Sequence, residues 1–137
     1  MARRPNDVEV EKFTLLKEHG ALTDTTTINV YKVPTGRTLR LDRVSYINVT
    51  GLLEDNANNF AGAILNDATT VATLFNTDAN LDPDTGASLE ADTFVEGAFV
   101  SEALRVFDAA EIVSLVLTET GTATLPAGTL ILEGRLF

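Results

Sequence analysis

The 137-residue chain contains no cysteine and no tryptophan, and it has a single histidine. Without cysteine it can form neither a disulfide nor a thiolate metal site. With one histidine, His19, a metal site that needs two histidine ligands is excluded, and a Ser-His-Asp triad would have to use this residue. His19 falls in a segment with weak structural signals, and we expect it to lie on the surface.

Long hydrophobic runs and catalytic motifs are also missing. No stretch approaches the ~20 apolar residues of a membrane-spanning helix. Acidic residues in 1–12 occupy the positions where a signal peptide has its apolar core, so we expect no membrane partner and no export by that route. The chain has no nucleophile elbow, HExxH motif or phosphate-binding loop, and we predict that it is not an enzyme and uses no cofactor.

The net charge of −10 is unevenly distributed along the chain. Residues 1–43 contain eight of the ten Lys and Arg and six acids, whereas residues 44–137 contain two basic residues and fourteen acids. Because nucleic-acid affinity depends on Lys and Arg neutralising phosphates, we predict no nucleic-acid partner. The distribution fits either a solubilising acidic surface or a mildly basic N-terminal region that docks on an acidic partner.

Short β-prone segments separated by turns dominate the chain from residue 25 onward. The expected strands cover 26–33, 37–50, 59–65, 69–75, 89–100, 102–107, 111–119 and 129–137. With a further strand near 13–16, this spacing is typical of an antiparallel sandwich or barrel. We predict an all-β fold, a jelly-roll-like antiparallel β-sandwich over 25–137, preceded by an extended N-terminal arm over 1–24. Residues 6–19 could instead form a short helix capped by Asn6.

The segment 37–50 changes the parity of its apolar side chains. Leu39 and Leu41 share one face, whereas Val44 and Tyr46 are apolar at the other parity. A strand with a period of two residues cannot change phase without an irregularity, so we expect a β-bulge near 42–43.

Two sets of charged residues are candidate binding sites. Arg37, Arg40 and Arg43 do not share one parity, and we expect them to be solvated or paired with acids rather than to form a flat basic patch. The acids and amides at alternate positions of 78–84 resemble cation ligands, but Pro83 and Leu89 occupy positions that an EF-hand reserves for glycine and an acid. A turn-rich surface loop is the preferred interpretation, with a calcium site as the alternative.

The last two residues, Leu136 and Phe137, are apolar. A frayed terminus would leave their side chains in water, so we predict that they lie in a sheet or in an oligomer interface.

Six segments between residues 25 and 137 combine strand and turn patterns. They are YKVPTGRTLRLDRV (31–44), NVTGL (48–52), LEADT (89–93), IVSLVLT (112–118), TATLPAG (122–128) and EGR (133–135). In these segments the chain resembles small virion proteins that tailed bacteriophages encode near their major capsid genes, the head decoration or cement proteins.

The resemblance implies a structural protein that is made in the host bacterial cytoplasm and binds the outside of a capsid. Its expected partners are the major capsid protein and further copies of itself, in a homotrimer. Within that scheme, we predict that Arg3, Arg4 and Lys12 contact the capsid and that Leu136 and Phe137 contact other copies. A tail or fibre module that recognises host glycans is the alternative, although sugar sites favour exposed aromatic residues and the chain has only Tyr31 and Tyr46 besides its phenylalanines.

Overall fold

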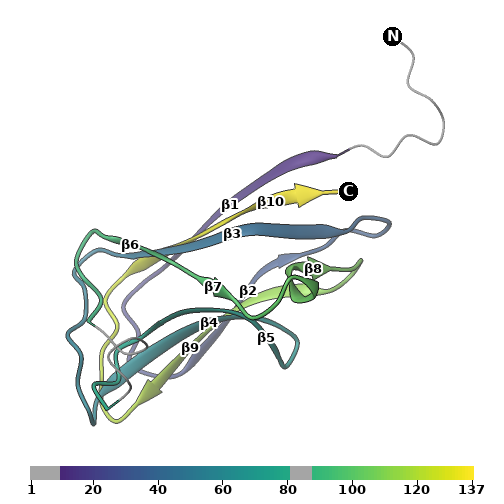
Figure 1. Ribbon diagram of the computed structural model, residues 1–137. Helices are drawn as coiled ribbons and strands as arrows, with labels where there is room; N and C mark the ends of the chain where they lie inside the picture. Colours follow the sequence, from purple (N-terminus) through teal and green to yellow (C-terminus); the bar gives the residue numbers. More distant parts are fainter. Residues whose placement is uncertain (1–9, 81–87) are drawn as a thin grey trace, which may run out of the picture.

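In a computed structural model, which describes residues 10–80 and 88–137, two antiparallel β-sheets pack face to face (Figure 1). Sheet I has the strand order β1 (Glu11–His19), β10 (Gly128–Leu136), β3 (Leu39–Asn48) and β6 (Phe94–Glu96), and β8 (Val106–Phe107) also pairs with β3. Sheet II has the order β2 (Thr26–Lys32), β9 (Ile112–Thr120), β4 (Asn59–Asn66), β5 (Thr69–Asn76) and β7 (Ala98–Phe99). A 3₁₀ turn, η1 (Ala103–Arg105), precedes β8.

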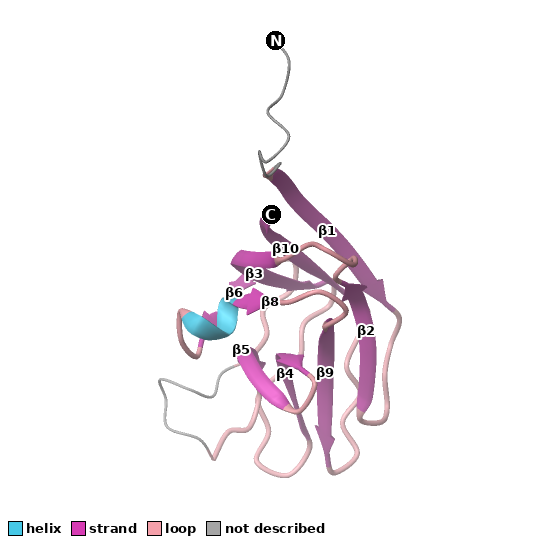
Figure 2. Ribbon diagram, turned by 90° about the vertical axis from the view of Figure 1, so that its right-hand side faces the viewer, coloured by secondary structure: helices cyan, strands magenta, loops and turns pink. Residues whose placement is uncertain are grey.

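The strand order is that of a jelly roll. Strands β1 to β4 alternate between the two sheets, and β4 and β5 form a hairpin within sheet II (Figure 2). Late in the chain, β9 inserts between β2 and β4, and β10 inserts between β1 and β3. This nesting of late strands between early ones is the double Greek-key arrangement. The predicted all-β sandwich is therefore confirmed.

The strand β1 belongs to the sandwich. It pairs with β10 along its whole length, from Glu11 opposite Leu136 to His19 opposite Gly128. The inward side chain of Phe13 is buried against the core, which explains why 11–19 form a strand rather than the alternative helix. The expected boundary between arm and sandwich at residue 24 thus falls after the first strand of sheet I. Residues 1–9 of the expected arm lie outside the described residues.

The expected strands over 89–100 and 102–107 are the least accurate part of the sequence prediction. Here the chain forms the short strands β6, β7 and β8, with η1 before β8. It leaves sheet I and joins sheet II at Gly97, where an added Cβ would overlap the side chain of Val44. Because the chain changes sheets here, no strand can continue through this glycine.

The predicted β-bulge in β3 is confirmed. Arg43 lies opposite Glu133 and Leu41 lies opposite Gly134, so Asp42 is an extra residue with no partner across the β3–β10 ladder. The extra residue restores the phase of the strand, and the apolar side chains on both sides of it are fully buried.

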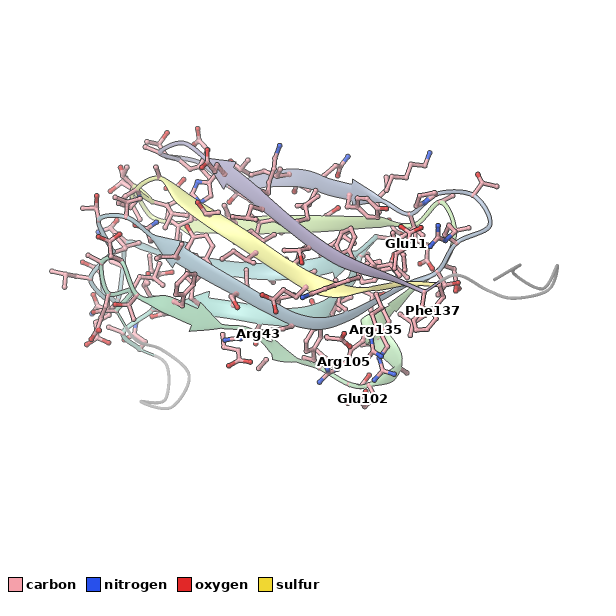
Figure 3. All side chains as sticks on the ribbon, turned by 90° about the horizontal axis from the view of Figure 1, so that it is seen from above. Glu11, Arg43, Glu102, Arg105, Arg135 and Phe137 are labelled. Carbon is pink, nitrogen blue, oxygen red and sulfur yellow. The ribbon has the colours of Figure 1, made fainter. Side chains whose placement is uncertain are left out.

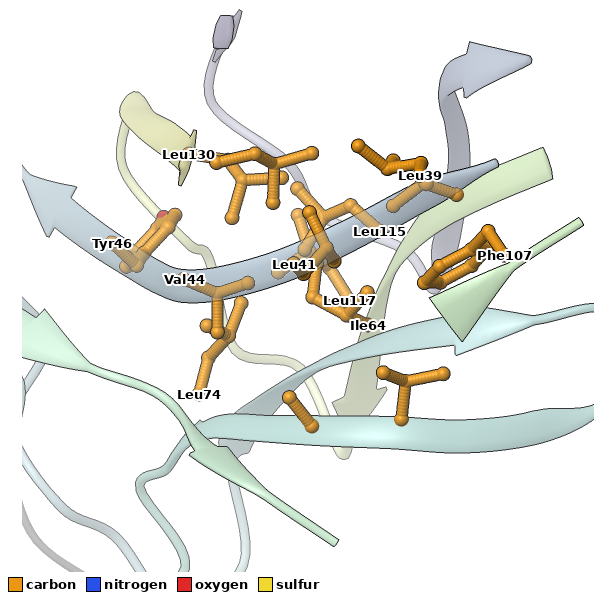
Figure 4. Packing of buried hydrophobic residues seen from close by; sticks show 14 of the residues in the cluster. Leu39, Leu41, Val44, Tyr46, Ile64, Leu74, Phe107, Leu115, Leu117 and Leu130 are labelled. Atoms are coloured by element: carbon orange, nitrogen blue, oxygen red, sulfur yellow. The ribbon is translucent and has the colours of Figure 1, made fainter. Parts of the chain in front are cut away.

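The core fills the space between the two sheets. Figure 4 shows Leu41 of β3 in this layer together with Leu115 and Leu117 of β9 and Ile64 of β4. All four side chains are fully buried. Burying each of them contributes roughly 1.5–3 kcal/mol relative to an exposed side chain, so the inward faces of these strands supply much of the stability.

Gly134 lies at the bulge, where the backbones of β10 and β3 are in close contact. A Cβ at this position would overlap the main-chain carbonyl of Arg40. We expect Gly134→Ala to lower the free energy of unfolding by about 2 kcal/mol, because the backbone must shift to make room. Gly20→Ala is the matched control, since a Cβ there meets nothing within 4 Å. Equal stability of the two variants in chemical denaturation would contradict this account.

Candidate interaction surface

The outer face of sheet I carries apolar side chains at positions where a solvated sheet normally has polar ones. Leu16 of β1 lies opposite Ile131 of β10, and Ile47 of β3 lies opposite Phe94 of β6. Ile131 also lies opposite Ser45, two residues from Ile47 on the same face, so the two pairs are diagonal neighbours. We call these four residues the apolar stripe.

The two ends of the apolar stripe are open to solvent. Leu16 is 65% exposed and Phe94 is 60% exposed, while Ile131 and Ile47 between them are half-buried. An apolar row that crosses four strands and is exposed at both ends makes this face a candidate surface for contact with another macromolecule.

Charged residues cover the same face beyond the apolar stripe, where β1 begins and β10 ends. Lys12, Arg135 and Arg40 lie side by side on neighbouring strands. Arg135 donates two hydrogen bonds to the Asp42 carboxylate, at 3.2 Å and 3.3 Å, and this contact raises the pKa of Arg135. Arg40 donates to Glu102 at 3.1 Å. Figure 3 shows Arg135, Arg105 and Glu102 gathered at this end, which we call the ionic end.

The remaining arginines of this region are also paired. Arg43 forms an ion pair with Glu96 at 3.4 Å. Arg105 lies 3.5 Å from Glu102, and its guanidinium stacks over the ring of Phe99 at 4.1 Å. The expectation that the arginines of 37–43 are paired or solvated rather than joined in one basic patch is confirmed.

Arg37 forms contacts that stabilise the C-terminal end of β10. Its Nε donates to the main-chain oxygen of Phe137 at 2.9 Å, and its Nη1 lies 3.4 Å from a carboxylate oxygen of Glu11. Thr38 and Phe137 also exchange main-chain hydrogen bonds. These contacts hold the last residues of the chain against β1 and the start of β3.

The structure places the predicted site residues in different surroundings. Lys12 is exposed at the ionic end, whereas Arg3 and Arg4 lie outside the described residues. Leu136 is 8% exposed and packs in the core of its own chain, so the expectation that it lies in a sheet is confirmed. Phe137 is half-buried. Contact of Leu136 or Phe137 with another copy stays a prediction.

The expectation that His19 lies on the surface is wrong. The residue is 9% exposed, and its ring stacks parallel to the ring of Tyr46, with centroids 5.8 Å apart. Nδ1 lies 2.7 Å from the carbonyl oxygen of Gly20, which can only accept, so this nitrogen carries the proton. Nε2 then accepts from the Tyr46 hydroxyl at 2.7 Å. Pairing of β1 with β10 places His19 on the inward face of sheet I. No local pattern in the sequence predicts this burial.

Asn48 completes this buried polar network. Its amide nitrogen donates to the Tyr46 hydroxyl at 3.1 Å and to the carbonyl of Pro126 at 2.7 Å. Its side-chain oxygen accepts from the main-chain nitrogen of Gly51 at 2.8 Å. Every polar atom of the three side chains is therefore satisfied, and the network ties β1 and β3 to the turns at one end of the sandwich.

The acidic loop considered for a cation is described only in part. Asp78 accepts a hydrogen bond from the main-chain nitrogen of Asn80 at 2.9 Å, which is the turn chemistry expected of a surface loop. Asp82 and Asp84 lie outside the described residues. Within 10–80 and 88–137, no group of three or more His, Asp or Glu side chains is placed to hold a metal ion.

In the same described ranges, no helix is long and apolar enough to cross a membrane. A shallow open hollow at the ionic end is lined by residues that include Val10, Lys12 and Arg135.

Sequence reasoning missed the apolar stripe. One member could have been noticed in the sequence. Ile131 is apolar, although it lies with Thr129, Glu133 and Arg135 on the side of the strand that is expected to face solvent. The other members could not be grouped with it, because their neighbourhood depends on which strands pair.

Comparison with known proteins gives little further information. No protein-family model matches the chain, and no curated protein sequence matches it. Among solved structures, the chain is similar to one from infectious bursal disease virus, Gx strain, with 13% identity and a TM-score of 0.24. The match covers 99% of this chain and 42% of that one, so this chain spans less than half of its neighbour. The fold assignment therefore depends on the strand order of this chain itself.

Tyr46 gives the buried network a measurable pH dependence. Burial raises the pKa of Tyr46 to about 12, from an ordinary value of 10.0. The neutral phenol is thus favoured in the folded state, and the stability that it contributes is complete below pH 10 and is lost as the pH rises to 12. We expect the free energy of unfolding to fall by up to ~3 kcal/mol across this window.

Tyr46→Phe is the comparison variant for that measurement. It should lose about 1–3 kcal/mol at neutral pH, because the hydrogen-bond partners on His19 and Asn48 are left without the hydroxyl. It should also lack the additional loss between pH 10 and 12. Parallel stability curves for the wild type and the variant over this range would contradict the assignment.

Proposed function

We propose that this protein is a structural virion component that binds the outside of a tailed-phage capsid and stabilises the shell, acting as a trimer. The observation that carries the proposal is the apolar stripe, a row of partly exposed apolar side chains on the outer face of a jelly roll. The resemblance of residues 25–137 to head decoration proteins supports the choice of the capsid as partner.

The physical properties of the chain suit such a role. An acidic surface keeps a protein soluble at the concentration that assembly requires. A capsid presents its binding site many times, and a trimer engages several sites at once. Modest contacts per copy therefore give high occupancy through avidity.

The capsid contact in this proposal includes the N-terminal residues Arg3, Arg4 and Lys12. Lys12 and Val10 border the hollow at the ionic end, so the described part of the chain begins at that end of the sandwich. In this proposal Arg3, Arg4 and Lys12 pair with an acidic area of the capsid surface.

Removal of residues 2–9 tests this contact. The deletion ends before β1, so the pairing of Glu11 with Leu136 is retained and thermal unfolding should match that of the intact chain. We expect occupancy to be lost when the variant is sedimented with purified capsids of the phage that encodes the chain. Undiminished occupancy would refute a role for these residues, and the absence of intact protein from both virions and capsid pellets would refute the proposed function.

The glycan-binding alternative has less support. Tyr46 is fully buried, and Tyr31 packs against Phe13 with ring centroids 4.7 Å apart. Neither tyrosine is free to stack on a sugar ring. Specific binding of the purified protein to a glycan array would favour this alternative.

A further inference from the structure

We infer that the outer face of sheet I is the surface through which copies of this chain contact one another. The inference rests on the proposed function only for the number of copies. The surface itself is identified from the position of the apolar stripe and from the distribution of charge around it.

The charges on this face balance, although the chain as a whole is acidic. The outer face of sheet I, together with η1 beside it, holds five cations and five acids, which are Lys12, Arg40, Arg43, Arg105, Arg135, Glu18, Asp42, Glu96, Glu102 and Glu133. The other described residues hold three cations and eleven acids, a net charge of −8. The outer face of sheet I is therefore neutral on an acidic molecule. The outward positions of the sheet II strands also lack acids, but none of the exposed large apolar residues lies on them, whereas Leu16 and Phe94 lie on sheet I.

The charges on this face neutralise one another within the chain. Asp42 binds Arg135, Glu102 binds Arg40, and Glu96 binds Arg43. A partner of strong charge of either sign would find no net opposite charge here. The face is instead complementary to a surface that is itself neutral and apolar.

A second copy offers such a surface. A symmetric assembly brings the same face of every copy toward its axis. When the outer face of sheet I is turned inward, the neutral surfaces meet at the centre and the acidic surfaces stay on the outside, where mutual repulsion is weakest. Contact through the acidic loops between the strands would instead bring acidic groups of two copies together.

The exposed side chains of the apolar stripe would supply the binding energy. Phe94 is an aromatic residue with most of its surface in water, and such residues are frequent energetic centres of interfaces. Leu16 lies at the other end of the apolar stripe, on β1 at the edge of sheet I. Both side chains point away from the core, so a charge placed at either position leaves the sandwich intact.

Three single variants test the inference by light scattering behind a sizing column. Leu16→Glu and Phe94→Glu place a carboxylate on the face, and Leu53→Glu is the matched control. Leu53 is 80% exposed in the loop between β3 and β4 and lies outside the apolar stripe. We expect the wild type and Leu53→Glu to have the mass of an oligomer. The other two variants should raise the dissociation constant by about a hundredfold and elute as folded monomers.

Salt provides a second readout. A neutral contact between acidic molecules should not weaken when the ionic strength is raised, because screening reduces only the repulsion between their outer surfaces. Dissociation of the wild-type oligomer by added salt would overturn the inference.

The remaining outcomes separate the inference from the proposed function. A wild type that stays monomeric across a concentration series overturns the inference. If Leu16→Glu then also loses capsid binding while Leu53→Glu keeps it, the face belongs to the capsid contact and the proposed function is strengthened. An oligomer that depends on Leu16 and Phe94 but does not bind capsids supports the inference and refutes the proposed function.

Discussion

The pairing of β10 with β1 and β3 is the interaction on which sheet I depends. This strand from the end of the chain lies between two strands from its beginning, and its hydrogen bonds are satisfied on both sides. Its inward leucines complete one wall of the core, and its outward Ile131 joins the two ends of the apolar stripe. Without β10, β1 would have no partner and Leu16 would be separated from Ile47 and Phe94. The C-terminal strand thus creates both the stability of the sheet and its candidate interaction surface.

The bulge at Asp42 links these two roles. It lets β3 present Leu39 and Leu41 inward before it and Val44 and Tyr46 inward after it. The residue that it adds carries a carboxylate outward, and Arg135 of β10 binds this carboxylate in bidentate fashion. A local irregularity in one ladder therefore keeps the core apolar and helps to make the opposite face electrically neutral.

The two ends of sheet I are stabilised by different interactions. At the ionic end, exposed or half-exposed ion pairs connect neighbouring strands, and each contributes little stability in water. At the other end, the network of His19, Tyr46 and Asn48 is buried, so each of its hydrogen bonds is costly to break. Of the two ends, the buried one therefore contributes more to the stability of sheet I. The ionic end instead controls which charge the surface presents to a partner.

The sequence by itself determined the class of fold and much of its detail. Alternation of apolar residues predicted β2 to β5, β9 and β10, and the change of parity after Leu41 predicted the bulge, because each is a pattern between near neighbours. The short strands around Gly97, the burial of His19 and the apolar stripe depend on contacts between segments far apart in the chain. In the sequence alone, nothing groups the four residues of the apolar stripe, which are Leu16, Ile47, Phe94 and Ile131. Only the order of strands in the sheet decides that they lie together, and this order is set by packing and long-range hydrogen bonding rather than by local propensity.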